Sequence, residues 1–115
     1  MPTVLIVEDE AIIALDLASE LKGLGLDILG LAKTYEQAME IAARTLPDIA
    51  IVDIMLNGAP DGARIAKDLR ARGVRVLVTS GGDKSPEHGG MIFLAKPWQR
   101  EELMRAVGTL ADAAD

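Results

Sequence analysis

The chain has 115 residues, a length that favours a single domain with its own hydrophobic core. Its 18 acidic and 12 basic residues give a formal net charge of −6, and the basic residues form no block that would attract phosphates. Trp, Tyr and Phe occur once each, too few to stack on bases, so we expect no direct binding to nucleic acid. The apolar runs are too short to cross a membrane and no secretion signal stands at the N-terminus, so we expect a cytoplasmic protein. Cysteine is absent, so the chain can form neither disulfides nor thiolate metal sites.

Short apolar runs are spaced along the chain and predict five buried strands. Each run is continuously apolar, interrupted only by Gly30 in the second and by Arg75 in the fourth, whereas a strand with one wet face would alternate. Continuous runs are typical of a parallel sheet that helices cover on both faces. The runs are residues 4–7, 28–31, 49–52, 74–78 and 91–94.

Helical patterns separate most of these runs. Gly23 and Gly25 predict the end of the first helix, Thr34 is the expected N-cap of the second, and Gly73 is the expected C-terminal glycine of the third. Apolar residues at spacings of three and four predict helices around residues 14–24, 35–45, 65–69 and 103–110.

The segment between the fourth and fifth runs differs from the other connections. Residues 81–90 read GGDKSPEHGG, with Pro86 inside and no apolar periodicity, so we predict mostly loop and at most a turn of helix. His88 in this loop is the only histidine and lies far from any catalytic pattern, so we expect it to have no metal or phosphohistidine role. Elsewhere strands alternate with helices, which predicts a right-handed, doubly wound α/β fold around a parallel sheet.

Polar and charged side chains follow four of the five runs. In an open α/β sheet, ligands bind outside the carboxyl ends of the strands. Clustered carboxylates repel each other, so a hard divalent cation such as Mg²⁺ and a lysine would compensate their charge, and such a set of groups suits phosphoryl transfer. The residues are Glu8, Asp9 and Glu10 after the first run, Asp53 after the third, Thr79 and Ser80 after the fourth, and Lys96 after the fifth. We interpret Glu10 as a helix cap, because an acid at the start of a helix favours its dipole.

Four stretches, in this order and spacing, resemble the receiver domain of two-component response regulators. They are VLIVEDE, IVDIMLNGAPDG, VLVTSG and FLAKPW, and the likeness covers the whole chain. The resemblance implies a flavodoxin-like fold with a five-stranded parallel sheet in the order 2-1-3-4-5. It also implies a single receiver domain over residues 1–115 with no output domain in this chain. A fourth helix that is short or absent departs from the common receiver and is similar to a subclass of stand-alone receivers.

The resemblance implies roles for individual residues. Asp53 is expected to be the phosphoacceptor, and Lys96 is expected to pair with the phosphoryl group. Mg²⁺ or Mn²⁺ is expected to bind Asp9 and Asp53 directly, Glu8 directly or through water, and the backbone carbonyl of Met55. The pair Asp61–Gly62 matches the glycine-containing turn that follows the phosphoacceptor in the family.

The same resemblance implies a hydroxyl and an aromatic residue that act as a switch. The family has the hydroxyl at the end of the fourth strand, followed by a small residue. Ser80 before Gly81 fits this pattern better than Thr79, whose side chain would point the other way because side chains alternate along a strand. Phe93 stands three residues before Lys96, where the family has its switch aromatic, and it lacks the hydroxyl that a tyrosine would offer.

By this resemblance, a histidine kinase or a phosphotransfer protein phosphorylates Asp53, and the modified domain changes its binding to a downstream protein that the sequence does not identify. Such a domain catalyses only its own phosphorylation and dephosphorylation, so it is not an enzyme for other substrates. Two alternatives stay open, an interaction domain that acts without phosphorylation and a phosphate sink. A phosphatase of the haloacid dehalogenase type is disfavoured, because Met55 stands where such an enzyme needs a second acid.

Overall fold

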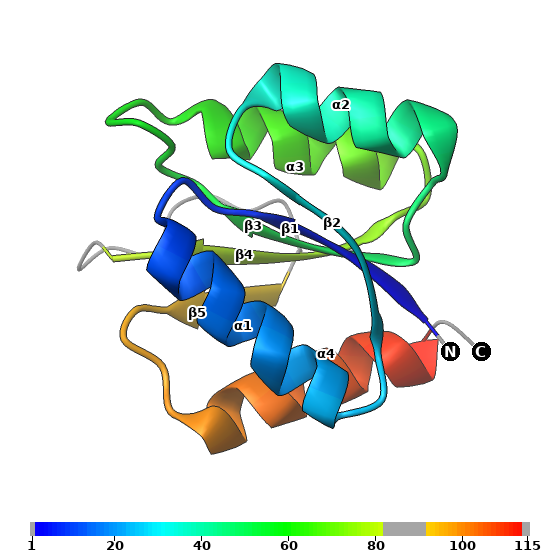
Figure 1. The fold of residues 1–115 in the computed structure, drawn as a ribbon, viewed down its shortest axis with the longest axis vertical. Coiled ribbons are helices and arrows are strands. Elements are labelled where there is room, and N and C mark those ends of the chain that lie inside the picture. Colours follow the sequence, from blue (N-terminus) through cyan, green and yellow to red (C-terminus); the bar gives the residue numbers. More distant parts are fainter. Residues whose placement is uncertain (1, 82–91, 114–115) are drawn as a thin grey trace.

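The computed structural model describes residues 2–81 and 92–113, which form a parallel sheet between two layers of helices (Figure 1). The strand order is β2-β1-β3-β4-β5, so the predicted doubly wound, flavodoxin-like fold is confirmed. The strands are β1 (Thr3–Val7), β2 (Asp27–Ala32), β3 (Ile49–Asp53), β4 (Arg75–Ser80) and β5 (Ile92–Ala95). The helices of the described residues are α1 (Ala11–Gly23), α2 (Tyr35–Arg44), α3 (Asp61–Ala71) and α4 (Arg100–Ala113).

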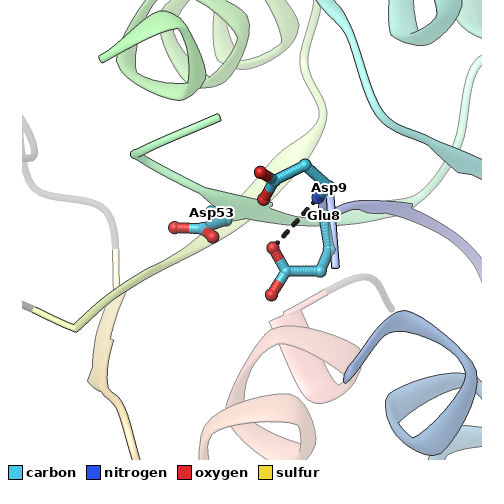
Figure 2. Close-up of side chains that lie close together, drawn as sticks. All are labelled: Glu8, Asp9 and Asp53. Atoms are coloured by element: carbon cyan, nitrogen blue, oxygen red, sulfur yellow. Dashed lines mark hydrogen bonds between the residues drawn. The ribbon is translucent and has the colours of Figure 1, made fainter. Parts of the chain in front are cut away.

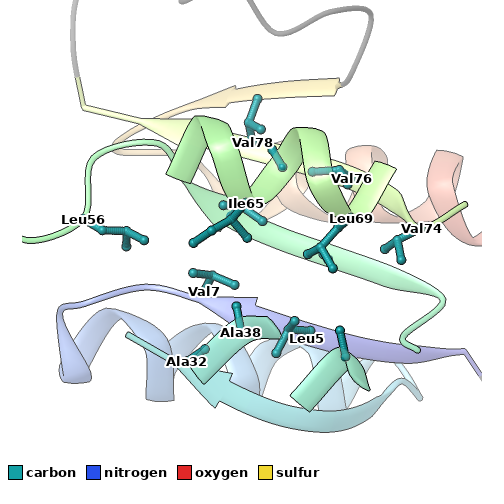
Figure 3. Close-up of a cluster of buried hydrophobic side chains, with 14 of the residues drawn as sticks. Leu5, Val7, Ala32, Ala38, Leu56, Ile65, Leu69, Val74, Val76 and Val78 are labelled. Carbon is teal, nitrogen blue, oxygen red and sulfur yellow. The ribbon is translucent and has the colours of Figure 1, made fainter. Parts of the chain in front are cut away.

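Two hydrophobic clusters hold the helices against the sheet. Helices α2 and α3 cover one face, and α1 and α4 cover the other (Figure 1). Because side chains alternate along a strand, Ala50 and Val52 of β3 belong to the α2–α3 cluster drawn in Figure 3, whereas Ile49 and Ile51 belong to the α1–α4 cluster. Both faces of β3 are therefore buried, which explains why its sequence is continuously apolar.

The ends of the helices follow the predicted signals. The side chain of Thr34 accepts a hydrogen bond of 3.1 Å from the backbone N–H of Gln37, so Thr34 caps α2. Gly73 has a φ of 91°, a left-handed conformation that favours glycine, and the backbone turns at this residue from α3 into β4. Glu10 occupies the N-cap position of α1, but its side chain makes no capping hydrogen bond.

Strands β3 and β4 extend beyond their apolar runs into the polar residues of the site. Strand β3 continues through Asp53, because Asp53 pairs with Thr79 of β4. Strand β4 continues through Ser80, which pairs with Ala95 of β5. Polar side chains expected to follow these strands are therefore carried on the strands themselves, where the ladder of backbone hydrogen bonds restrains them.

The predictions for residues 82–91, including the role of His88 and most of the expected loop, lie outside the described residues. None of the helices in residues 2–81 and 92–113 has the length and apolar character that crossing a membrane requires.

Candidate functional site

The carboxyl ends of β1 and β3 bring three carboxylates together (Figure 2). Glu8 and Asp9 directly follow β1, and Asp53 is the last residue of the neighbouring strand β3. One carboxylate oxygen from each residue lies within 4.8 Å of the others. Glu8 and Asp53 are only 4% and 6% exposed, so their charges are removed from water and require compensation inside the protein.

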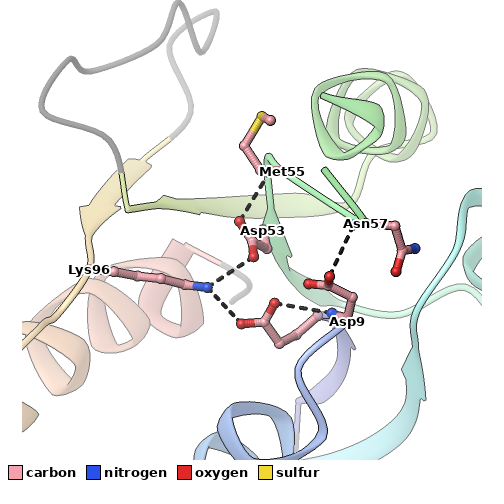
Figure 4. Close-up of polar contacts among 6 residues, drawn as sticks. Asp9, Asp53, Met55, Asn57 and Lys96 are labelled. Atoms are coloured by element: carbon pink, nitrogen blue, oxygen red, sulfur yellow. Dashed lines mark hydrogen bonds and ion pairs between the residues drawn. The ribbon is translucent and has the colours of Figure 1, made fainter. Parts of the chain in front are cut away.

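Lys96 supplies part of that compensation. It follows β5, and its ammonium reaches across β4 to the two buried acids, with Nζ 2.6 Å from Glu8 Oε1 and 2.9 Å from Asp53 Oδ2 (Figure 4). The backbone N–H of Lys96 donates a 2.8 Å hydrogen bond to the carbonyl of Ser80, which continues the pairing of β4 with β5 as far as Lys96. The peptide bond between Lys96 and Pro97 is cis. The predicted convergence of the acids and the lysine is therefore present.

Burial and charge shift the proton affinities of this cluster. The pKa of Glu8 is raised to about 7, chiefly by burial and then by the neighbouring Asp53, while Lys96 acts in the opposite direction. Burial lowers the pKa of Lys96, but its hydrogen bonds to Glu8 and Asp53 and the negative charge of these acids together outweigh that effect, so the pKa of Lys96 is raised overall. Lys96 therefore keeps its positive charge at neutral pH, and Glu8 binds a proton more readily than an ordinary glutamate does.

A glycine at the start of α3 sets the position of the Asp53 backbone. The N–H of Gly62 donates a 2.9 Å hydrogen bond to the carbonyl of Ile54, and a Cβ at Gly62 would lie 1.8 Å from the carbonyl oxygen of Asp53. No side chain fits at that distance, so only glycine lets α3 approach the end of β3 this closely. The family resemblance matched the pair Asp61–Gly62 to a glycine-containing turn. The close approach of α3 to the Asp53 backbone is the physical reason why this position requires glycine.

The sequence did not identify Asn57 as part of the site. Its backbone N–H donates a 3.0 Å hydrogen bond to Asp9 Oδ2, and the backbone N–H of Asp9 in turn donates a 3.1 Å bond to Glu8 Oε2 (Figure 4). The pair Asn57–Gly58 could have predicted a tight two-residue turn at this place, because this dipeptide favours such turns.

The three carboxylates are suitable ligands for a hard divalent cation. Mg²⁺ and Mn²⁺ prefer a few carboxylate oxygens together with water, which matches the cluster of Glu8, Asp9 and Asp53. The backbone N–H of Met55 donates a 3.2 Å hydrogen bond to Asp53 Oδ1, so the Met55 backbone lies beside the cluster. Its carbonyl as a metal ligand stays a prediction.

The two hydroxyls and the aromatic residue of the predicted switch lie close by along β4 and β5. Thr79 and Ser80 are both buried, Thr79 pairs with Asp53, and Phe93 pairs with Val78. Phe93 is half-buried and packs against the α2–α3 cluster. This register does not decide which hydroxyl reaches a bound phosphoryl group, so the choice of Ser80 and the switch role of Phe93 stay predictions.

Known proteins share this sequence pattern. The family model of the response regulator receiver domain matches residues 4–108. The transcriptional regulatory protein PdtaR of Mycobacterium tuberculosis is 31% identical over 111 residues, which cover 90% of this chain and 54% of that protein. The phyllosphere-induced regulator PhyR of Methylorubrum extorquens is 37% identical over 67 residues, which cover 57% of this chain and 25% of that protein. The chain thus spans about half of PdtaR and a smaller share of PhyR.

Solved structures share the fold. The receiver domain of the Erythrobacter litoralis response regulator PhyR has a TM-score of 0.84 and 27% identity, over 96% of this chain and 90% of that one. The signal receiver domain of a modulated diguanylate cyclase from Desulfovibrio desulfuricans G20 has a TM-score of 0.85 and 34% identity, over 99% of this chain and 96% of that one. Since the family model, the sheet order and these structures agree over almost the whole chain, this chain belongs to the family of response regulator receiver domains.

Proposed function

We propose that this receiver domain accepts a phosphoryl group on Asp53 and that the modification switches its binding to another protein in two-component signalling. The observation that carries the proposal is a buried carboxylate on the end of a strand, 2.9 Å from the ammonium of Lys96 and beside two further acids. A nucleophile held in this way needs little reorganisation, and the lysine is placed to neutralise charge on the phosphoryl oxygens.

In the proposed transfer, one carboxylate oxygen of Asp53 attacks the phosphorus of a phosphohistidine on a histidine kinase or a phosphotransfer protein. The new P–O bond forms as the P–N bond breaks, and the electron pair of that bond returns to the imidazole nitrogen. Hydrolysis by water later releases inorganic phosphate and restores the carboxylate. Both steps act on the chain's own residue, so the proposed domain is a switch and not an enzyme for other substrates.

The acid cluster gives the proposed reaction its metal requirement. Mg²⁺ or Mn²⁺, held by Asp9, Asp53 and Glu8 with the Met55 carbonyl, would supply charge neutralisation at the phosphoryl oxygens. Asp9 and Glu8 would hold the metal beside the reacting carboxylate of Asp53.

The proposed signal begins with the groups that contact Asp53. When Asp53 carries the phosphoryl group, its carboxylate no longer pairs with Lys96, and the lysine follows the phosphoryl oxygens. Ser80 donates a hydrogen bond to the same group, and Phe93 packs further inward. Phosphorylation then shifts the population between two arrangements of the β4 and β5 ends, and a downstream protein binds one of them.

A mass measurement tests the proposal. After incubation with acetyl phosphate and Mg²⁺, the wild-type chain should gain the mass of one phosphoryl group, and Asp53→Asn should gain none. Asp48→Asn, at the other end of β3, is the matched control and should be phosphorylated like the wild type. Absence of a mass gain in the wild type, at acetyl phosphate concentrations that label other receivers, would contradict phosphotransfer.

An optical readout follows from the position of Trp98. The only tryptophan packs against the α1–α4 cluster and lines a small cavity together with Lys96. Movement of Lys96 should therefore change the fluorescence of Trp98 when beryllofluoride and Mg²⁺ are added, and the change should be absent in Asp53→Asn.

An interaction domain that acts without phosphorylation is the second function, and one observation favours it. Lys96 forms ion pairs with both Glu8 and Asp53, and such pairs also occur where they serve only the fold. Under this alternative, Asp53→Asn binds the downstream partner as the wild type does. A phosphate sink differs again, because it is phosphorylated without any change in partner binding.

A further inference from the structure

The loop between β3 and α3 closes on itself in a tight hairpin. Leu56 and Ala59 exchange two backbone hydrogen bonds of 2.8 and 3.0 Å, and only Asn57 and Gly58 lie between them. Asn57 has a φ of 53° and Gly58 a φ of 80°, so both residues are left-handed, as a two-residue type I′ turn requires. We call residues 57–58 the Asn57–Gly58 turn.

The Asn57–Gly58 turn is anchored on two sides. Leu56, directly before it, is 1% exposed and belongs to the α2–α3 cluster. The side-chain amide of Asn57 donates a 3.4 Å hydrogen bond to the carbonyl of Lys33, which lies in the connection between β2 and α2. The turn is therefore held by the core on one side and by a neighbouring connection on the other.

This anchoring aims one backbone donor at the acid cluster. Because the hairpin satisfies Leu56 and Ala59 internally, the N–H of Asn57 is available, and it donates to Asp9 Oδ2 at 3.0 Å. A hydrogen bond from an amide to an ionised carboxylate is among the stronger kinds. In the described part of the chain, no protein hydrogen bond involves the other oxygen, Asp9 Oδ1, so that oxygen is left for a metal.

We propose that the Asn57–Gly58 turn is a positioning element for the metal site: it holds the carboxylate of Asp9 by one oxygen and presents the other to Mg²⁺. The inference rests on the proposed function, since it concerns the metal that phosphoryl transfer requires. Partners that orient a metal ligand typically change metal affinity 10–100-fold when they are lost, as an order of magnitude. A rigidly held ligand also favours Mg²⁺ over Ca²⁺, because Mg²⁺ demands shorter bonds and stricter geometry.

Three variants separate positioning from simple structural support. Asn57→Val places a β-branched residue at a positive φ, which such residues strongly disfavour, and should open the turn. Asn57→Gly removes the side-chain bond to Lys33 but keeps both the left-handed conformation and the backbone N–H. Gly73→Val is the matched control, because Gly73 has a φ of 91° with no atom within 4 Å of an added Cβ, and it precedes β4 at the amino ends of the strands, away from the acids.

The experiment measures the Kd for Mg²⁺ and for Ca²⁺ by isothermal titration calorimetry, together with Tm in the absence of metal. Asn57→Val should weaken Mg²⁺ binding by about tenfold or more and weaken Ca²⁺ binding less. Asn57→Gly should stay within about threefold of the wild type for Mg²⁺, below the range expected for a lost positioning contact. Gly73→Val should lower Tm by about 5 °C or more, as Asn57→Val does, without changing either Kd.

The outcomes distinguish the inference from the proposed function. If the Tm of Asn57→Val falls as that of Gly73→Val does, but Asn57→Val binds Mg²⁺ like the wild type, the turn is only structural and the inference is overturned. If the wild-type chain itself binds no Mg²⁺, the metal site and the proposed phosphotransfer both fail. Should Asn57→Val not fold, Asp9→Ala gives a second test by NMR, where the Asn57 amide proton should move upfield and exchange faster, and an unchanged amide would overturn the inference.

Discussion

The two ends of strand β3 each carry an aspartate, and the two aspartates are treated in opposite ways. Asp48, just before the strand, is exposed, and its Oδ2 accepts hydrogen bonds from Thr3 N at 2.8 Å and from Thr3 Oγ1 at 3.2 Å. Asp53, the last residue of the strand, is 6% exposed and lies beside two other acids, with Lys96 as its cationic partner. Neutral donors at the surface satisfy Asp48, whereas Asp53 depends on a buried ion pair.

The contrast shows which acid serves stability and which serves reactivity. The carboxylate of Asp48 accepts hydrogen bonds from Thr3 at the surface, and these bonds stabilise the contact between β1 and the loop before β3. A buried acid cluster raises the free energy of the folded state unless a cation compensates it. Substitutions at the Asp53 end should therefore affect both stability and chemistry, and substitutions at the Asp48 end should affect stability alone.

The largest effect is expected at Gly62. In Gly62→Ala, the new Cβ would lie 1.8 Å from the Asp53 carbonyl oxygen, so α3 or the end of β3 must move. We expect the free energy of unfolding in urea to fall by about 3 kcal/mol, and phosphorylation by acetyl phosphate to fall with it. Gly108→Ala is the control, because no atom lies within 4 Å of a Cβ added there. Wild-type stability in Gly62→Ala would show that α3 does not fix the reactive end of the strand.

The next effect is expected at Lys96. Lys96→Met keeps the length of the side chain but leaves Glu8 and Asp53 without their cation. We expect the free energy of unfolding at pH 8, without metal, to fall by about 2–3 kcal/mol, since removing one partner of a buried pair strands the other. Saturating Mg²⁺ should restore much of this loss, because the metal replaces the missing charge. A loss that Mg²⁺ leaves unchanged would mean that Lys96 and the metal do not share the same acids.

A pH-dependent effect is expected at Glu8. Its pKa is raised from an ordinary 4.5 to about 7, chiefly by burial, so the folded state holds this proton more tightly than the unfolded state does. The stability that this proton contributes is fully present below pH 4.5 and is lost as the pH rises through 7. In EDTA, Glu8→Gln should therefore become more stable relative to the wild type across this window, by on the order of 2 kcal/mol. Parallel stability curves for the two proteins would contradict the raised pKa.

Much of the fold and of the reactive groups followed from the sequence, because both depend on local patterns. Continuous apolar runs indicated a sheet buried on both faces, and parallel strands place their carboxyl ends at one edge, so Asp53 and Lys96 were expected to converge if their strands were near neighbours. The family resemblance then supplied the strand order. These inferences needed no knowledge of side-chain geometry.

What the sequence could not supply depends on close approaches in three dimensions. The hydrogen bond between Asn57 and Asp9 joins residues far apart in the chain and exists only after the hairpin closes. The reason for glycine at position 62 is a contact with the Asp53 backbone, which no pattern encodes. The choice between Thr79 and Ser80 stays open even with the register known, because both are buried at the end of β4.

The smallest effect, and the sharpest test of the contrast between the two aspartates, is expected at Asp48. Asp48→Ala removes the acceptor for Thr3 N and Thr3 Oγ1, and should lower the free energy of unfolding by about 1 kcal/mol. Asp48→Asn keeps an acceptor oxygen and should stay near the wild type. Because Asp48 lies at the amino end of β3, neither variant should alter the Kd for Mg²⁺ or the extent of phosphorylation. A change in Mg²⁺ binding in Asp48→Ala would show that strain passes along β3 from one end to the other, and the separation between a stabilising acid and a reactive acid would not hold.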